Sequence, residues 1–487
     1  MSSYVFPPAE RTKFLLGLTR SQTIVVGVVI MTITVATALD ALWVGVLAAL
    51  PVLFVGLVSW HGRPLRERLS TRLGFWWRLR RRNVAWSAPI TGSVGRGSQP
   101  ACLKGVSLRL AEPREEWAVG EPVGVVQARN NLSIVLPVSG PQMALLGEEE
   151  TDEHLAAFGD VLSSICGERS ERAISRLSWT DVHGAADPRS LVRHHQAAGV
   201  SGPATEEYRA HIGKVAGTAA DHRVFVTVTV DRSALKVHAS RTTSRSASAK
   251  DLMTVIVDEG LALARELDQR GFTVGRPLSP LGLSRLIRQL GDPFAPVPLV
   301  PTLSERLSLP EKGQEGPEQI TAQRLAVSID GALHRAYQLR WPARPVSGDW
   351  LRTLLTAAGG PKFTTVVFEP VPPSRSARRL STEMARSSSN NEVQARRKGR
   401  VTAKGNAQLA ALKAREDELV DGHAELDTLA IVVVSARDEA ELDERSKALE
   451  RAAQRCGGAR VRPLDTRHDV GWAAALPIGL RVDRSPE

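Results

Sequence analysis

The residue types that perform catalysis are present in this sequence, but their spacing does not match the sites that use them. A phosphate loop needs G-x-x-x-x-G-K-[ST], because backbone amides, the lysine and the hydroxyl hold the phosphates and magnesium. The single Gly-Lys pair is Gly213-Lys214; Val215 replaces the hydroxyl residue and Tyr208 replaces the first glycine. No H-E-x-x-H or G-x-S-x-G motif occurs. The sequence therefore predicts a protein that is not an enzyme and has no cofactor.

Histidine and cysteine also lack the spacing of metal ligands. His194 and His195 are adjacent, so their side chains would point in different directions from a helix. The three cysteines, Cys102, Cys166 and Cys456, are far apart and form no C-x-x-C pair. A structural zinc site needs about four closely spaced ligands. We therefore predict no metal site and no disulfide framework.

Positive charge is concentrated in two segments of the 487-residue chain, whose formal net charge is +11. Residues 63–82 contain eight arginines and one acidic residue, and residues 375–415 contain eleven basic and two acidic residues. The first segment is typical of an interfacial helix on an anionic membrane or of a topology signal. The second is typical of a solvated, partly coiled-coil arm, with nucleic-acid contact as the alternative. The candidate contact residues are Arg63, Arg66, Arg68, Arg72, Arg78, Arg80, Arg81, Arg82, Arg396, Arg397, Lys398 and Arg400.

Two uncharged stretches near the N-terminus predict a transmembrane hairpin. Residues 23–39 and 41–60 contain no charged side chain, and Asp40 separates them. A membrane-spanning helix needs about 20 apolar residues, with roughly 17 as the lower limit. Basic residues flank both sides of the pair, so the positive-inside rule places both termini in the cytoplasm. We therefore expect a multi-pass protein of the bacterial inner (plasma) membrane, with residues 1–62 forming the hairpin.

The rest of the chain predicts a mixed α/β (α+β) protein with two cytoplasmic lobes. Residues 63–99 are expected to form a basic interfacial helix followed by a Gly/Ser/Pro-rich linker. Residues 100–295 form the first lobe, residues 296–320 a Pro-rich connector, and residues 321–487 the second lobe. A basic helical arm, 375–427, is inserted in the second lobe, with a break expected near residues 387–391.

Local patterns place several elements in these lobes. Strict alternation in residues 224–230 (VFVTVTV) predicts a strand. Asp330-Gly331 between two strand patterns predicts a tight hairpin turn. Apolar residues at helical spacing predict helices over residues 251–270 and 438–456.

Several phrases resemble components of type IV secretion systems. GLTRSQ at 17–22, followed by the apolar pair, is similar to the PrgI-like inner-membrane subunit. DGALHRAYQLRWPARPVSGDWLRTLL (330–355), VVFEPVPPSRSARRL (366–380), AREDELVDGHAEL (414–426) and AAALPIG (473–479) resemble, in this order, the pre-ATPase half of the VirB-type conjugation ATPase. The chain is identified as a member of an actinobacterial family that fuses the two parts.

The resemblance implies a scaffold rather than a motor. In the ATPase family a nucleotide-binding core follows the segment that matches AAALPIG, whereas this chain ends eight residues after Gly479. The implied function is a non-enzymatic inner-membrane scaffold that anchors a separate ATPase at a secretion or conjugation channel. The implied partners are the membrane, that ATPase, channel subunits and further copies of the chain, in a homo-oligomer.

Three other functions stay open at this stage. An EccE-like membrane component of type VII secretion also has two N-terminal helices and a cytoplasmic domain. A membrane-tethered DNA-binding adaptor would use residues 375–415 and would lose affinity steeply with salt. An enzyme of unrecognised chemistry would need a pocket with converging titratable groups.

Overall fold

A computed structural model shows one large sheet with helices on both faces. It describes residues 13–15, 18–40, 42–60, 63–81, 84–87, 99–113, 117, 122–140, 147–166, 173–185, 205–208, 211, 220–233, 249–295, 316–342, 346–347, 350–357, 360–398, 403–421 and 423–480. The mixed α/β class is confirmed. Most of the predicted linker (88–98) and connector (296–315), the pair His194-His195 and Gly213 to Val215 lie outside the described residues.

The sheet contains 13 strands, and each recorded pairing in it is antiparallel. Its order is β5-β12-β13-β14-β16-β15-β9-β10-β8-β7-β6, with β11 beside β8 and β17 beside β14. The strands are β5 (Ala85–Ser87), β6 (Val106–Ala111), β7 (Val123–Ala128), β8 (Asn131–Ser139), β9 (Ile174–Ala185), β10 (Ala220–Asp231), β11 (Thr273–Val274), β12 (Gln319–Ala322), β13 (Val327–Ile329), β14 (Ala332–Arg340), β15 (Lys362–Pro370), β16 (Leu426–Ala436) and β17 (Arg460–Pro463).

Local sequence accounts for several of these strands and turns. The predicted strand at 224–230 lies within β10, and the turn at Asp330-Gly331 joins β13 to β14 with Ile329 opposite Ala332. Asp330 and Gly331 have φ angles of 47° and 96°. Two successive positive φ values match the twist of the flanking strands, and Asp-Gly tolerates both. These two sequence predictions are confirmed.

Helices cover the two faces of the sheet. On one face, two adjoining apolar clusters hold residues of α4 (Glu148–Ser164), α8 (Ala249–Gln269), α11 (Arg352–Thr356) and α14 (Glu439–Arg455). On the other face, a third cluster holds residues of η1 (Ala101–Leu103), α9 (Pro280–Gly291) and α15 (His468–Ala475). Helix starts follow side-chain caps: Ser279 accepts from the Gly282 amide, and Asp438 from the Glu441 amide.

The two predicted lobes share this sheet. β9 of the first lobe pairs with β15 of the second from Leu177↔Phe368 to His183↔Lys362. The cluster around α15 draws on both lobes, including Val126 and Ile431. The lobe boundaries themselves stay a prediction, but the described residues form one continuous structure across them.

The segment after α15 crosses the join between the lobes. Arg176 of β9 donates to the Gly479 carbonyl over 3.1 Å. Gly479 has a φ of 67°, and a Cβ there would lie 2.2 Å from Ser133 Oγ and 2.3 Å from Thr229 Oγ1. Only glycine combines this backbone conformation with so close an approach. The AAALPIG phrase is therefore a structural part of the sheet domain.

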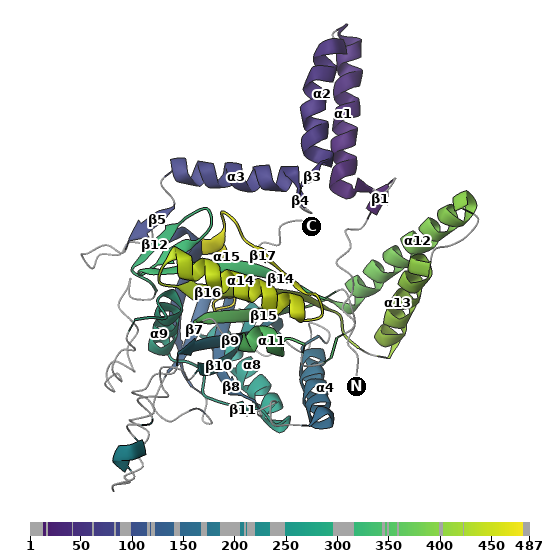
Figure 1. Ribbon diagram of the computed structural model, residues 1–487. Coiled ribbons are helices and arrows are strands. Elements are labelled where there is room, and N and C mark those ends of the chain that lie inside the picture. The colour runs from purple at the N-terminus through teal and green to yellow at the C-terminus, as the bar shows by residue number, and fades with distance from the viewer. Residues whose placement is uncertain are drawn as a thin grey trace.

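Three N-terminal helices and a helical arm extend from the sheet domain (Figure 1). α1 (Arg20–Ala38) and α2 (Leu42–Leu57) form an antiparallel pair, and α3 (Leu65–Arg80) runs crosswise at its base. Two short two-stranded sheets, β1 (Lys13–Leu15) with β2 (Leu18–Thr19) and β3 (Ser59–Trp60) with β4 (Arg63–Pro64), flank the pair.

The predicted transmembrane hairpin is not supported, and the predicted multi-pass inner-membrane location is wrong. Within the part of the chain that the structure describes, no helix combines the length and apolar character needed to cross a membrane. α2 has 16 residues and includes Pro51; at 1.5 Å per residue it is about 24 Å long. The hydrocarbon core of a bilayer is about 30 Å thick. α2 is shorter than the predicted span because Ser59 and Trp60 pair with β4 instead of continuing the helix.

The arm consists of α12 (Pro373–Lys398) and α13 (Ala403–Val420). The expected break near residues 387–391 is wrong, because α12 continues through this stretch. Ser387 is buried, and the Asn391 amide donates to the Gly405 carbonyl over 3.2 Å. These serine and asparagine side chains lie at or near the seam with α13, so tertiary contact outweighs their weak helix propensity.

Candidate interaction surfaces and a polar cluster

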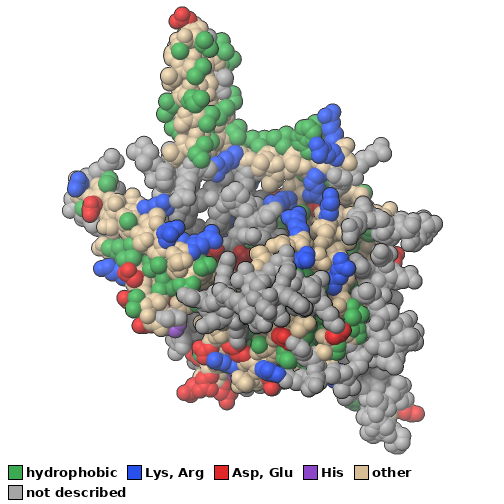
Figure 2. All heavy atoms as spheres, turned by 180° about the vertical axis from the view of Figure 1, so that it is seen from behind, with side chains coloured by type: hydrophobic (Ala, Val, Ile, Leu, Met, Phe, Trp, Pro, Cys, Tyr) green, Lys and Arg blue, Asp and Glu red, His purple; other side chains and the backbone are tan. Residues whose placement is uncertain are grey.

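The α1–α2 pair exposes large hydrophobic side chains along its length. Among the side chains that the structure describes, twelve between Ile24 and Phe54 are 44–83% exposed, with Trp43 the most exposed. Figure 2 shows hydrophobic side chains, in green, along the pair and along α3. Exposed apolar surface on this scale is typical of an interaction site.

The outer side of α3 carries large apolar side chains. Leu69, Leu73, Trp76 and Trp77 recur at helical spacing and are 39–53% exposed. Arg80 lies over the Trp76 ring at 4.5 Å, and Arg81 over the Trp77 ring at 5.6 Å. Cation–π contact of this kind holds the guanidinium beside the indole. The outer side of α3 therefore combines apolar and cationic groups.

Arg78 points the other way and attaches α3 to the sheet domain. Its guanidinium makes two hydrogen bonds to Asp469 in the first turn of α15, one of them over 3.4 Å. The Asp469 side chain is 4% exposed, and that of Arg78 is 27% exposed. The Thr466 hydroxyl also contacts the Thr71 carbonyl over 3.4 Å. Arg78 therefore has a positioning role rather than the predicted role in surface contact.

The predicted contact residues separate into several groups in the structure. Arg72, Arg80, Arg81 and Arg396 are exposed, and Arg66 and Arg68 are half-buried. The structure does not describe the side chains of the remaining five, which are Arg63, Arg82, Arg397, Lys398 and Arg400. For the exposed group, contact with a membrane surface or nucleic acid stays a prediction.

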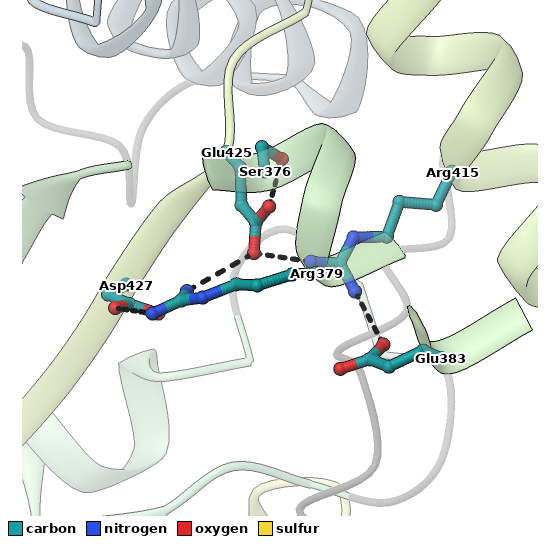
Figure 3. A network of polar contacts seen from close by, with 6 residues as sticks. All are labelled: Ser376, Arg379, Glu383, Arg415, Glu425 and Asp427. Atoms are coloured by element: carbon teal, nitrogen blue, oxygen red, sulfur yellow. Dashed lines mark hydrogen bonds and ion pairs between the residues drawn. The ribbon is translucent and has the colours of Figure 1, made fainter. Parts of the chain in front are cut away.

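A network of ion pairs fixes the root of the arm (Figure 3). The Glu425 carboxylate, 12% exposed, accepts hydrogen bonds from the Ser376 hydroxyl and the Arg415 guanidinium and lies 3.7 Å from Arg379. Arg379 also makes hydrogen bonds of 3.1 and 3.3 Å to Asp427. The hydrogen bond to Asp427 is the main cause that raises the pKa of Arg379. Arg379 and Arg415 of the basic segment therefore form ion pairs within the chain.

We expect Glu425→Gln to loosen the arm. The change removes the charge that Arg379 and Arg415 share, and hydrogen bonds to charged groups contribute about 1.5–3 kcal/mol each. The expected results are a free energy of unfolding lower by about 2 kcal/mol and faster protease cleavage within α12 and α13. Glu416→Gln, at an exposed position of α13, is the matched control. Equal cleavage rates in both variants would contradict this role of the network.

Three neighbouring strands bring a polar cluster together on one face of the sheet. His222 of β10 lies directly opposite His183 of β9, which in turn lies opposite Lys362 of β15. His183 Nδ1 and His222 Nε2 are 2.8 Å apart, and His222 Nδ1 is 3.4 Å from Asp181 Oδ1. The Lys362 ammonium donates to the carbonyls of Leu354 and Ala357 over 2.8 and 2.7 Å.

Burial changes the charge states in this cluster. Removal from water by burial is the largest cause of each shift. Burial raises the pKa of Asp181, lowers the pKa of His183 to about 4 and lowers the pKa of Lys362 to about 8. Lys362 and His222 further lower the pKa of His183. The His183 ring is therefore neutral at pH 7. Sequence inspection missed this cluster because its members are brought together only by strand register.

Two histidines of the second lobe, His334 and His468, are buried and hydrogen-bonded to neighbouring strands and helices. The His334 ring is fully buried between the Ser435 hydroxyl at 2.9 Å and the Gly291 carbonyl at 2.7 Å. His468 accepts from the Ala336 amide over 3.1 Å. Burial lowers the pKa of each imidazole to about 4. Among the described residues, no group of three or more histidine, cysteine or carboxylate side chains is arranged to hold a metal ion.

We expect acid to destabilise the fold through His334 and His468. Their folded pKa values lie below the ordinary histidine value near 6.5, so the unfolded chain binds more protons as the pH falls from about 6.5 to about 4. Each histidine then removes about 1.4 kcal/mol of stability per pH unit. Denaturant unfolding at a series of pH values measures this slope.

His334→Gln is expected to reduce this slope by about 1.4 kcal/mol per pH unit, which corresponds to one proton fewer taken up on unfolding. His423→Gln, at an exposed site on the loop after α13, is the matched control. An unchanged slope in His334→Gln would show that His334 does not bind a proton on unfolding in this range.

Comparison with known proteins does not assign a family. No protein-family model matches the sequence, and no curated protein matches it. The resemblance to PrgI-like subunits and to the pre-ATPase half of VirB-type ATPases therefore stays a prediction.

Proposed function

We propose that this chain is a non-enzymatic scaffold subunit of a type IV-like secretion or conjugation apparatus, where it brings a separate ATPase to channel subunits. The observation that carries the proposal is the α1–α2 pair with its twelve exposed large hydrophobic side chains. Covering such a surface with a partner is favourable because it removes apolar area from water. The exposed apolar surface therefore supports an interaction function.

The arrangement of the remaining elements supports the same function. The continuous sheet provides a rigid body, and the α1–α2 pair and the α12–α13 arm extend from different parts of it (Figure 1). The network around Glu425 gives the arm a defined root. The secretion context comes from the sequence phrases described above, several of which lie in β14, β15 and the arm.

We also propose that α3 contacts an anionic lipid surface from one side. Its two tryptophans lie on the outer side beside Arg80 and Arg81, an arrangement typical of helices that lie among lipid head groups. Nucleic acid is less favoured as the partner of the basic arm, because Arg379 and Arg415 are paired within the chain. Residues 375–415 also contain no aromatic side chain on which bases could stack.

Replacing Arg72, Arg80 and Arg81 together by glutamine should weaken binding to vesicles that contain anionic lipid. Each arginine near such a surface contributes about 1 kcal/mol, so we expect a loss of about 100-fold at low salt. Vesicle co-sedimentation across a salt series measures it. Arg352→Gln, an exposed arginine on α11, is the control. Equal binding of both proteins would contradict the assignment of α3.

The scaffold function is tested by recovering the full-length protein from its own cells under mild conditions. Mass spectrometry should identify a phosphate-loop ATPase together with channel subunits. The variant Trp43→Ser, Leu47→Ser, Leu50→Ser should lose channel subunits, since these side chains are 59–83% exposed and are not needed for the sheet core. Val420→Ser, 81% exposed on the arm, is the control. Recovery of nucleic acid alone, released by salt, would overturn the proposal and favour the DNA adaptor.

A further inference from the structure

We infer that His183 and His222 form a binding site for a divalent transition-metal ion that prefers ligands at right angles, such as Cu²⁺ or Ni²⁺. The inference is independent of the proposed scaffold function. It rests on the cross-strand placement of the two rings, the carboxylate behind one of them, and the separation of their nitrogens.

The two imidazoles converge because of strand register. His183 and His222 are directly opposite each other in the β9–β10 pairing, and their ring centroids are 4.4 Å apart. His183 Nδ1 and His222 Nε2 face each other at 2.8 Å. Imidazole nitrogen suits copper, nickel and zinc. In the structure these two nitrogens share a hydrogen bond, and a metal ion bound to both would take the place of its proton, which would move to the other nitrogen of that ring.

The separation of the two nitrogens is that of a hydrogen bond, and it can be compared with the spacing that each metal geometry requires. Two metal–nitrogen bonds of about 2.05 Å at a right angle place the nitrogens about 2.9 Å apart, whereas tetrahedral geometry requires about 3.3 Å. The observed 2.8 Å lies close to the first value. Square-planar or octahedral ions fit the pair with small ring rotations, and the His222 side chain is 41% exposed, which leaves room for them.

Asp181 supplies the partner that metal-binding histidines usually have. A ligand histidine commonly donates its second ring N–H to a carboxylate, which fixes the ring and makes the ligand nitrogen more basic. Asp181 Oδ1 lies 3.4 Å from His222 Nδ1, so Nε2 is left to face His183. The Asp181 side chain is 5% exposed, and its other oxygen, Oδ2, is buried with no hydrogen-bond partner among the residues that the structure describes. This buried carboxylate offsets the charge of a bound cation.

The charge environment is compatible with a metal ion. Metal binding needs imidazole nitrogens free of protons, and the Asp181 carboxylate behind His222 opposes the added positive charge. The Lys362 ammonium is the nearby cation, and it is held by the carbonyls of Leu354 and Ala357. With two protein ligands, the remaining coordination positions would be filled by water. The expected affinity is therefore that of a two-histidine site rather than of a closed structural site.

The test is a Cu²⁺ titration of the full-length protein after treatment with a chelator. We expect one ion per chain, an electron paramagnetic resonance spectrum with two equatorial nitrogen ligands, and a higher unfolding temperature, because a ligand of the folded state stabilises it. Zn²⁺ should bind more weakly than Cu²⁺. His222→Ala and His183→Ala should each abolish the two-nitrogen spectrum.

Asp181→Asn separates the supporting role of the carboxylate from direct ligation. It should keep the two-nitrogen spectrum and lower the Cu²⁺ affinity by about 10- to 100-fold. His423→Ala is the control for an exposed histidine, and a His194→Ala, His195→Ala double variant controls for the adjacent pair in the sequence. Loss of binding in the double variant, or unchanged binding in both His183→Ala and His222→Ala, would overturn the inference. Circular dichroism checks that each variant is folded.

Discussion

Trp472→Ala is expected to lower the free energy of unfolding by about 3–5 kcal/mol, the range for removing a large aromatic side chain from a core. Trp472 is fully buried in the cluster that both lobes share, and its indole N–H donates to the Leu290 carbonyl over 3.0 Å. Its loss would leave a cavity and an unpaired carbonyl. Denaturant unfolding monitored by circular dichroism measures the change.

The same experiment tests whether the lobes are one cooperative unit. Because the cluster contains residues of both lobes, we expect a single unfolding transition that shifts as a whole. Trp77→Ala is the matched control, since Trp77 is 53% exposed and its removal should change stability by less than about 0.5 kcal/mol. Two transitions, of which Trp472→Ala moves one, would show that the lobes unfold independently.

Arg78→Ala is expected to cost about 3 kcal/mol, near the lower end of the range for breaking a buried ion pair. The Asp469 carboxylate would be left almost fully buried without its cation, while Arg78 itself is partly exposed. α3 should also detach from α15 and become accessible to proteases. Unfolding free energy and the rate of cleavage within residues 65–81 are the two measurements.

A double-mutant cycle isolates this pair. Asp469→Asn alone should cost less than Arg78→Ala, and adding Asp469→Asn to Arg78→Ala should restore part of the lost stability because the unpaired charge is removed. Arg72→Ala, on the outer side of the same helix, should leave stability unchanged within about 0.5 kcal/mol. Additive effects of Arg78→Ala and Asp469→Asn would show that the two side chains do not interact.

The core around Trp472 and the Arg78–Asp469 ion pair connect the stability of the fold to the proposed function. The shared core makes the sheet domain a single rigid body, and the Arg78–Asp469 pair fixes α3 on it. α3 continues into the α1–α2 pair through β4 and β3, so its attachment sets where the exposed apolar surface is presented. A scaffold needs such defined geometry because its partners must be held at fixed positions.

Helices, strands and turns that depend only on neighbouring residues could be predicted from the amino-acid sequence. The alternation in β10, the Asp-Gly turn between β13 and β14 and the amphipathic periods of α8 and α14 depend on neighbouring residues, and each was predicted within a few positions. The mixed α/β class followed from these elements. The apolar and basic character of α1, α2 and α3 could also be predicted from the sequence, although apolar composition overstated the length of α2.

How distant segments of the chain meet depends on packing and strand pairing across the whole molecule. The β9–β15 pairing, which joins the lobes, connects strands almost two hundred residues apart, and no local pattern specifies such a pairing. The same register places His222 beside His183 and Asp181, and packing turns Arg78 inward to Asp469 while Arg80 and Arg81 stay outside. Side-chain type shows what a residue can do, but strand register and burial decide which groups it touches.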